Sequence, residues 1–214
     1  MSSKSARWIG SDEAGKGDYF GPLVVAAVLV DNATARSLEE LGAKDSKRLS
    51  DKSVTELAAR VNSQCLCSVV AIGPEKYNEL YSKIGNLNRL LAWGHSRAIE
   101  NILDKETCDY ALADQFGDEG FLIGALMEKG KSIEVKQEVR AESNIGVAAA
   151  SILARAEFLR RLAVLSAKYG MHFPKGASPA VIEAGKEFVN RYGRERLNEV
   201  AKLHFKTTKS VLAD

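Results

Sequence analysis

No stretch of this sequence is apolar for long enough to cross a lipid bilayer. The longest uninterrupted apolar run is the eight residues 23–30, whereas a membrane-spanning helix needs about 20. The N-terminus, MSSKSARW, lacks the apolar segment that a secretory signal requires. These absences argue against integral membrane and secreted proteins, so we expect a cytoplasmic protein without a membrane partner.

Cysteine is also scarce. Cys65, Cys67 and Cys108 are an odd number at a spacing that fits no zinc site, so we expect reduced thiols. Internal repeats, low-complexity tracts and long linkers are missing as well. With 214 residues, 45% of them hydrophobic and 27% charged, the chain suits a single globular domain.

Charge of one sign is concentrated at one end of the chain. The formal net charge is only +2, but residues 1–140 carry 18 Lys+Arg against 21 Asp+Glu, and residues 141–214 carry 12 against 7. A basic C-terminal third suits a phosphate-bearing partner. A solvated helical surface has the same composition, so charge alone leaves both interpretations open.

Hydrophobic patterning predicts a layered α/β or α+β domain with a mixed central sheet. The segment 22–31 is apolar on both faces, which is typical of a central strand. We expect strands at residues 6–12, 22–31, 65–73, 108–114 and 132–143. We expect helices at residues 51–62, 74–103, 147–168, 179–193 and 194–204.

Four acidic residues follow the ends of predicted strands. Asp12 and Glu13 are adjacent at the end of the first, Asp114 ends another, and Glu142 lies just past a third. If these ends are neighbours, about four negative charges share one cleft and raise each other's pKa unless cations intervene. Two divalent cations would supply the balancing charge, as in two-metal phosphodiester hydrolysis.

A simpler interpretation applies to each acid taken alone. Acids at strand ends are most often caps or solvated charges, and no periodicity shows that these three strand ends meet. At this level the convergence is an assumption.

Seven ordered stretches resemble the type 2 ribonuclease H family, and ribonuclease HIII most closely. They cover about residues 8–209: GSDEAGKGDYFGPLVVAAV, KDSKRLSDK, KYNELYSKIGNLNRLLAWGHSRAIENIL, ADQF, VRAESNIGVAAASILAR, FPKGAS and KLHFKTT. The resemblance implies an α/β ribonuclease H-like fold, with a mixed five-stranded sheet flanked by helices and a helical C-terminal extension. It divides the single domain 1–214 into a core of about residues 1–168 and an extension of about residues 169–214.

The same resemblance implies an endoribonuclease that cleaves the RNA strand of RNA/DNA hybrids with Mg²⁺ or Mn²⁺, leaving 5′-phosphate and 3′-hydroxyl ends. The family's four metal-binding catalytic acids fall on Asp12, Glu13, Asp114 and Glu142. The fourth acid separates subtypes, because ribonuclease HIII carries Glu there and ribonuclease HII-like proteins usually carry Asp.

The resemblance also implies substrate contacts. Gly15, Lys16 and Gly17 align with a glycine loop that approaches the minor groove and the 2′-hydroxyl groups, where a plain hairpin turn is the alternative. Lysines assigned to phosphates or to the metal region are Lys47, Lys175 and Lys206. His95 is interpreted as structural. Tyr77, Tyr81 and Trp93 are interpreted as packing residues.

In one respect the chain departs from ribonuclease HIII, which normally has an N-terminal domain of the TATA-binding-protein type. Only seven residues precede Trp8, so we expect no such domain, and we expect a monomer. Three alternatives stay open: ribonuclease HII-type incision at single ribonucleotides in DNA, a non-catalytic hybrid-binding module, and another nuclease or recombinase on the same fold.

Overall fold

Five strands form one mixed sheet in the computed structural model, which describes residues 6–44 and 49–213. The strand order is β3-β2-β1-β4-β5. β1 pairs antiparallel with β2 and parallel with β4, while β2–β3 is antiparallel and β4–β5 parallel. The strands are β1 Arg7–Ala14, β2 Leu23–Asp31, β3 Cys67–Ile72, β4 Tyr110–Asp114 and β5 Glu134–Glu138.

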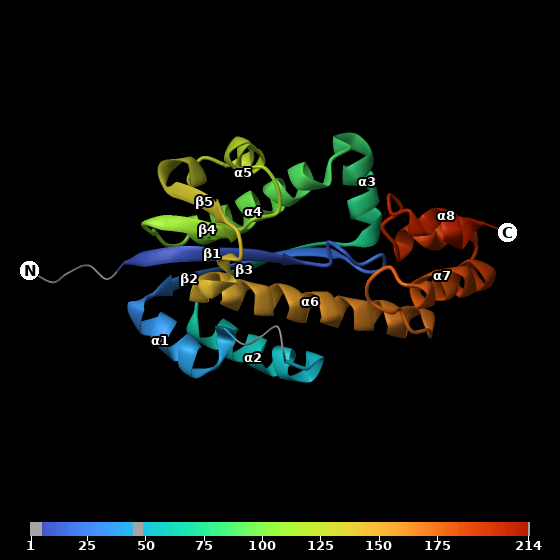
Figure 1. The fold of residues 1–214 in the computed structure, drawn as a ribbon, viewed down its shortest axis with the longest axis horizontal. Coiled ribbons are helices and arrows are strands. Elements are labelled where there is room, and N and C mark those ends of the chain that lie inside the picture. Colours follow the sequence, from blue (N-terminus) through green and yellow to red (C-terminus); the bar gives the residue numbers. More distant parts are fainter. Residues whose placement is uncertain (1–5, 45–48, 214) are drawn as a thin grey trace, which may run out of the picture.

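Helices cover both faces of this sheet (Figure 1). One face packs against α1 (Asn32–Glu40), α2 (Asp51–Gln64) and α6 (Ile145–Tyr169). The other packs against α3 (Pro74–Ile84), α4 (Leu87–Leu103) and α5 (Glu119–Ala125). Short 3₁₀ turns lie at Gly130–Ser132 (η2), Ala141–Ser143 (η3) and Arg194–Glu199 (η4). The predicted five-stranded, helix-flanked fold is therefore confirmed.

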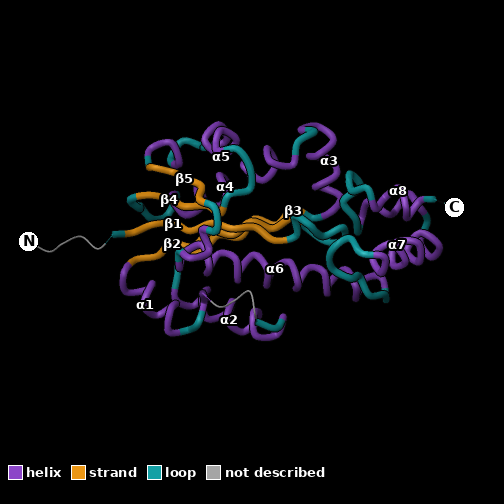
Figure 2. The backbone as a smooth tube through the Cα atoms, in the orientation of Figure 1, coloured by secondary structure: helices purple, strands orange, loops and turns teal. Residues whose placement is uncertain are grey.

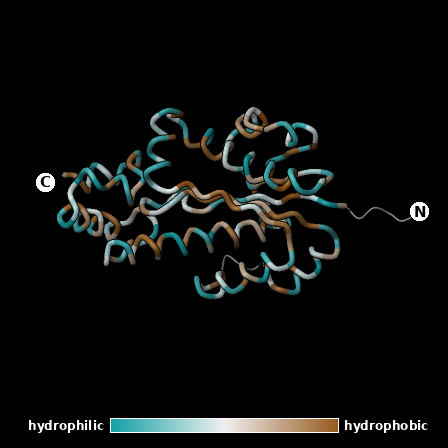
Figure 3. The backbone as a smooth tube through the Cα atoms, turned by 180° about the vertical axis from the view of Figure 1, so that it is seen from behind, coloured by the Kyte–Doolittle hydropathy of each residue, from teal (hydrophilic) through white to brown (hydrophobic). Residues whose placement is uncertain are grey.

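β2 is the most deeply buried strand. All of its residues from Leu23 to Val30 are buried, and their side chains alternate between the two cores. Coloured by hydropathy, the strands form the apolar centre, whereas the helices mix apolar and polar residues (Figure 3). The apolar run that is too short for a membrane is thus a central strand. In the described part of the chain, no helix is long and apolar enough to cross a membrane.

The chain ends in α7 (Pro179–Tyr192) and α8 (Thr207–Leu212). They lie at the same end of the molecule as the loop between β1 and β2 (Figure 2). The helix predicted for 194–204 is wrong: only the 3₁₀ turn η4 forms there. The backbone beyond it is used elsewhere, because Val200 accepts a hydrogen bond from Gly21 N–H and Lys202 donates one to the Tyr19 carbonyl.

Two other predicted elements have different bounds. The helical stretch 74–103 is two helices, because Gly85 ends α3 in the left-handed conformation (φ 65°) and Asn86 caps α4. The strand expected at 132–143 ends at Glu138. Helices α1, α5 and α8 were not expected, since each has at most nine residues, too few for a clear periodic pattern. Cys65, Cys67 and Cys108 are free, as expected.

A close backbone approach joins β1 to α6. A Cβ atom added at Gly10 would overlap the carbonyl carbon of Gly146 and the amide nitrogen of Val147. No side-chain rotation relieves such an overlap, so the strand or the helix must move.

We therefore expect Gly10→Ala to lower the free energy of unfolding by about 3 kcal/mol or more. Urea denaturation measures the change. Gly124→Ala in α5 is the matched control, because its Cβ would meet no atom within 4 Å and alanine favours a helix. Equal stability of the two variants would contradict the packing described here.

Candidate active site

Asp12 and Glu13 lie within β1, which continues to Ala14, rather than beyond its end. Successive side chains of a strand point to opposite faces. Asp12 accepts a hydrogen bond from Ser151 of α6, whereas Glu13 contacts His95 of α4. The two adjacent acids therefore belong to opposite sides of the sheet.

Asp12 lies beside Asp114, one residue past the last paired residues of β1 and β4. The parallel register aligns Ser11 with Ala113, which makes Asp12 and Asp114 neighbours at the carboxyl ends of β1 and β4. Burial and the charge of Glu13, with a smaller contribution from Asp114, raise the pKa of Asp12 to about 6. A bound cation would stabilise the ionised form of a carboxylate that is buried beside other carboxylates.

Asp114 also anchors the turn that carries Glu142. Its Oδ1 accepts a hydrogen bond of 2.9 Å from the Ala141 N–H, and Glu142 is the next residue of η3, half-buried. The carboxyl end of the sheet thus brings together Asp12, Asp114 and the turn bearing Glu142.

Glu13 is held by a buried histidine that the sequence did not point out as part of the site. His95 is fully buried and lies between Ser11 and Glu13: its Nδ1 is 2.6 Å from Ser11 Oγ and its Nε2 is 3.1 Å from Glu13 Oε2. Its ring stacks on Phe116, with centroids 4.8 Å apart. Burial disfavours the Glu13 carboxylate, but hydrogen bonds and charge from His95 and Lys16 outweigh it and lower its pKa.

A signal for this role was present in the sequence. Ser11 and Glu13 are two residues apart in a strand, so they share a face, and one imidazole on a facing helix can bridge them. The interpretation of His95 as structural omitted this contact with a candidate site residue.

The loop after β1 contains two glycines, Gly15 and Gly17, and only the first is required by the fold. Gly15 has φ 86°, and a Cβ there would overlap the Pro22 carbonyl oxygen, so the fold itself requires glycine. Gly17 is exposed, has no positive φ, and its Cβ would meet nothing within 4 Å. The fold therefore does not explain Gly17. Lys16 turns back, with Nζ 3.4 Å from Glu13 Oε1 and 3.3 Å from the Phe116 carbonyl.

The C-terminal third holds this loop in place. Gly176 N–H donates to Asp18 Oδ1 (2.6 Å) and its carbonyl accepts from Tyr19 N–H (2.9 Å). Lys202 is fully buried, and its Nζ donates to the Asp18 carbonyl at 2.7 Å. Burial lowers the pKa of Lys202 to about 7.

The three lysines predicted to bind substrate lie in different settings. Lys175 forms an ion pair of 2.8 Å with Asp51. Lys206 is exposed at the start of α8, and the preceding Phe205 packs against Tyr19 of the loop. Lys47 falls outside the described residues.

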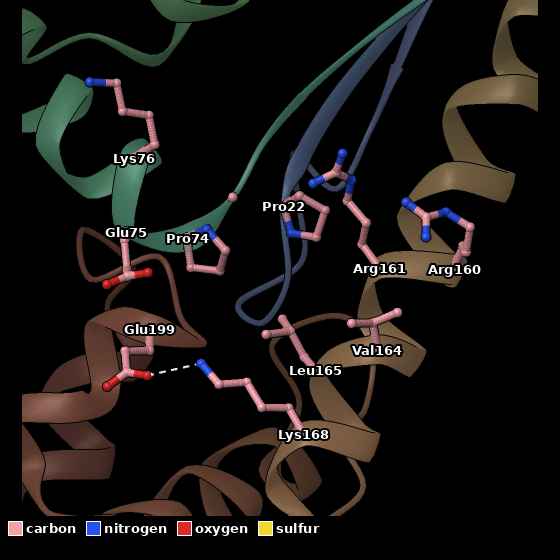
Figure 4. A pocket seen from close by; sticks show the side chains of 11 residues that line it. Pro22, Pro74, Glu75, Lys76, Arg160, Arg161, Val164, Leu165, Lys168 and Glu199 are labelled. Carbon is pink, nitrogen blue, oxygen red and sulfur yellow. Dashed lines mark hydrogen bonds and ion pairs between the residues drawn. The ribbon is translucent and has the colours of Figure 1, made fainter.

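A hollow of about 380 Å³ lies between the start of α3, the second half of α6 and Glu199 of η4 (Figure 4). Pro22, Pro74 and Leu165 contribute apolar surface, and Lys168 reaches Glu199 at 3.2 Å. Asp12, Glu13, Asp114 and Glu142 do not line it. Asp12, Glu13 and Asp114 lie instead at the carboxyl ends of β1 and β4.

Oxygen ligands of this kind fit a hard divalent cation. Across the described residues, no three carboxylate, imidazole or thiolate groups are gathered closely enough to hold a metal ion unaided. Mg²⁺, however, commonly binds through one or two carboxylates, with waters and substrate phosphate oxygens as its other ligands. The pair Asp12 and Asp114 satisfies that requirement.

A model of the ribonuclease HII family matches residues 9–208. The chain belongs to the ribonuclease HII family. Ribonuclease HIII of Protochlamydia amoebophila is 46% identical over 204 residues, which cover 95% of this chain and 68% of that protein. Ribonuclease HIII of Chlamydia pneumoniae is 46% identical over 202 residues, or 93% and 68% of the two chains. This ribonuclease HII-family chain thus spans about two thirds of the length of these relatives.

Solved structures of the family have the same fold. A crystal structure of Bst-RNase HIII in complex with Mn²⁺ superposes with a TM-score of 0.90 at 32% identity, covering 99% of this chain and 70% of that one. A complex of PCNA and RNase HII from Archaeoglobus fulgidus gives a TM-score of 0.81 at 30% identity, covering 97% of both chains.

The raised pKa of Asp12 predicts how the stability of this ribonuclease HII-family protein changes with pH. Between about pH 4 and pH 6 Asp12 binds a proton in the folded state but not in the unfolded state, so its contribution to stability falls as pH rises through this window. Asp12→Asn removes the penalty and should raise the free energy of unfolding at pH 7 by roughly 1–3 kcal/mol, with no gain at pH 4. Urea denaturation in EDTA at both pH values measures it.

Asp31→Asn is the control for this measurement. Hydrogen bonds from Thr34 lower the pKa of Asp31 at the α1 N-cap, so its replacement should stabilise the protein at neither pH. An Asp12→Asn variant that gains equally at both values would show that ionisation is not the cause.

We expect His95→Phe to weaken Mn²⁺ binding about 10–100-fold, as is typical when a group that orients a ligand is lost. Phenylalanine keeps the buried ring against Phe116 but removes both hydrogen bonds, so the fold should persist. Calorimetric titration with Mn²⁺ measures binding, and circular dichroism checks folding. Unchanged affinity in a folded variant would mean that Glu13 needs no orientation by His95.

Proposed function

We propose that this protein is an endoribonuclease that hydrolyses the RNA strand of RNA/DNA hybrids, leaving 5′-phosphate and 3′-hydroxyl ends. One observation carries the proposal: Asp12 and Asp114 are neighbours at the end of the sheet, beside a loop whose Gly17 the fold does not require. Membership of the ribonuclease HII family and the relatives named ribonuclease HIII support it.

Mg²⁺ or Mn²⁺ is the cofactor that we assign, with Asp12, Glu13, Asp114 and Glu142 as its ligands. The related Bst-RNase HIII structure is a complex with Mn²⁺. When bound, such cations lower the pKa of the attacking water and stabilise the charge that develops on the phosphate oxygens.

The protein's own groups hold the carboxylates in position. Ser151 orients Asp12, the Ala141 N–H orients Asp114, and His95 orients Glu13. Both ring nitrogens of His95 are engaged, so we assign it no role as a general base.

Recognition of RNA is assigned to the loop of Gly15, Lys16 and Gly17. An exposed glycine backbone admits close approach of a nucleic acid, and the 2′-hydroxyl is the group that distinguishes RNA from DNA. Lys47, Lys175 and Lys206 are proposed phosphate contacts, which add affinity without sequence preference.

Within the family, we propose ribonuclease HIII-type specificity, with ribonuclease HII-type incision at single ribonucleotides as the alternative. The HII pattern has Gly-Arg-Gly and a tyrosine at the junction of RNA and DNA. Here Lys16 supplies a point charge instead of a planar fork. Phe173, in the FPKGAS stretch, is buried against Phe20, so its ring does not face a substrate.

We further propose one catalytic domain with residues 169–214 as its helical extension, acting as a monomer in the cytoplasm. The free cysteines, whose thiol pKa values burial raises to about 11 or 12, suit a reducing compartment. Sedimentation at micromolar concentration would test the oligomeric state.

The decisive experiment compares a uniform RNA/DNA hybrid with a DNA duplex that contains one ribonucleotide. The protein should cleave the uniform hybrid at least about 10-fold faster, because loss of one shaped arginine contact costs about that factor. Asp114→Asn should lose cleavage by about 1,000-fold or more while remaining folded, since it removes a metal ligand. Denaturing gels give rates, and phosphatase treatment identifies the ends.

Each contrary result has a distinct meaning. Equal rates on both substrates would support the HII-type alternative while keeping the metal site. A 2′,3′-cyclic phosphate would show attack by the substrate's own 2′-hydroxyl and remove the metal-activated water. Binding without cleavage by the wild-type protein would support a non-catalytic module.

A further inference from the structure

Arg140 has a backbone conformation that arginine rarely adopts. Its φ of 58° and ψ of 41° place it in the left-handed region, and it is the only residue other than glycine with positive φ in the described part of the chain. A Cβ atom makes this conformation costly, and such strain gathers at functional sites.

The conformation has a clear structural purpose. Arg140 lies between the end of β5 at Glu138 and the turn η3, and it redirects the chain so that the Ala141 N–H reaches Asp114. The Ser143 N–H then closes the turn on the Arg140 carbonyl. Glycine or asparagine would make the same turn with less strain, so the turn does not explain an arginine.

The side chain of Arg140 is exposed and makes no hydrogen bond or ion pair with residues 6–44 or 49–213. Two arginines in the C-terminal half of α6 behave differently: Arg160 and Arg161 each pair with Glu157, at 2.7 and 2.6 Å. Arg140 is thus an unpaired cation within two residues of Glu142 and one residue from the amide that holds Asp114.

We propose that Arg140 binds a backbone phosphate of the hybrid next to the cleaved bond. This role rests on the proposed function. Asp12 and Asp114 determine where the reacting phosphate sits. Arg140 directly precedes Ala141, whose N–H holds Asp114, so it lies near the phosphate that follows or precedes the reacting one. Guanidinium binds phosphate through two parallel hydrogen bonds, which accounts for arginine at a position where the backbone alone favours glycine.

The proposal assigns Arg140 to substrate binding rather than to the chemical step. The acidic residues around it, Glu138, Asp114 and Glu142, would repel a phosphate backbone that carries no bound cation. A fixed positive charge beside them offsets this repulsion where the polymer must approach the acids.

The proposal is tested by steady-state cleavage of the uniform hybrid across a range of KCl concentrations. Four proteins are compared: wild type, Arg140→Asn, Arg140→Lys and Arg60→Gln. Asparagine tolerates the left-handed region but lacks the charge, and lysine keeps the charge. Arg60 is the control, an exposed arginine on α2 whose side chain has no partner among the described residues. Thermal unfolding of each variant accompanies the kinetics.

For Arg140→Asn we expect KM to rise about 10-fold with kcat within about 3-fold, and the salt slope of log(kcat/KM) to flatten by about 1. Arg140→Lys should recover the slope, and Arg60→Gln should match wild type. The melting temperature of Arg140→Asn should not fall, because the turn becomes less strained.

Two results would overturn the inference while hybrid cleavage stands. The first is a KM and a salt slope for Arg140→Asn equal to those of Arg60→Gln. The second is an equal loss of activity and of melting temperature in Arg140→Asn and Arg140→Lys, which would show a structural role. A wild-type protein that cuts no hybrid would instead overturn the proposed function, and this inference with it.

Discussion

The backbone contact between β1 and the first turn of α6 determines where the candidate site lies. Gly10 and Gly146 permit it, since a side chain on Gly10 would occupy the space of the helix backbone. Asn144, the N-cap of α6, adds a hydrogen bond of 3.0 Å from Trp8 Nε1. With the helix start held on the strand, Ser151 faces Asp12 one to two turns further along, and η3 with Glu142 lies directly before it.

Pairing of β1 with β4 completes this arrangement. The two strands are parallel, so their carboxyl ends meet at one edge, and Asp12 and Asp114 become neighbours although about a hundred residues separate them. Around them the sheet creates two environments. Asp12, on the α6 side, has a raised pKa, whereas Glu13, on the α4 side, has a lowered one because of His95 and Lys16. Two adjacent carboxylates therefore differ in how readily each holds a proton and how much each gains from a cation.

The C-terminal extension positions the loop that accompanies these acids. Gly176, Val200 and Lys202 hydrogen-bond to residues 18–21 through their backbone groups, and the buried Lys202 side chain adds a hydrogen bond to the Asp18 carbonyl. The C-terminal third of the chain was predicted to present a basic surface, but it also holds this loop in place. Not all of its cations are free at the surface: Lys202 is buried, and Lys168 and Arg196 form ion pairs with Glu199. Arg140, by contrast, remains exposed beside the acids.

The sequence by itself determined the layered α/β class, the central strand at 23–31 and the long helix α6, because their periodic patterns are long and uninterrupted. It also pointed to the four acids as candidate site residues, through their positions at strand ends and through the ordered family motifs. Tertiary structure alone decided which of them are neighbours, since strand order and register depend on contacts far apart in sequence. The contact of His95 with Ser11 and Glu13, the left-handed turn at Arg140 and the replacement of a helix at 200–204 by bonds to the loop were likewise decided by the fold. Each depends on a partner that lies tens of residues away or on a local conformation that the residue type disfavours.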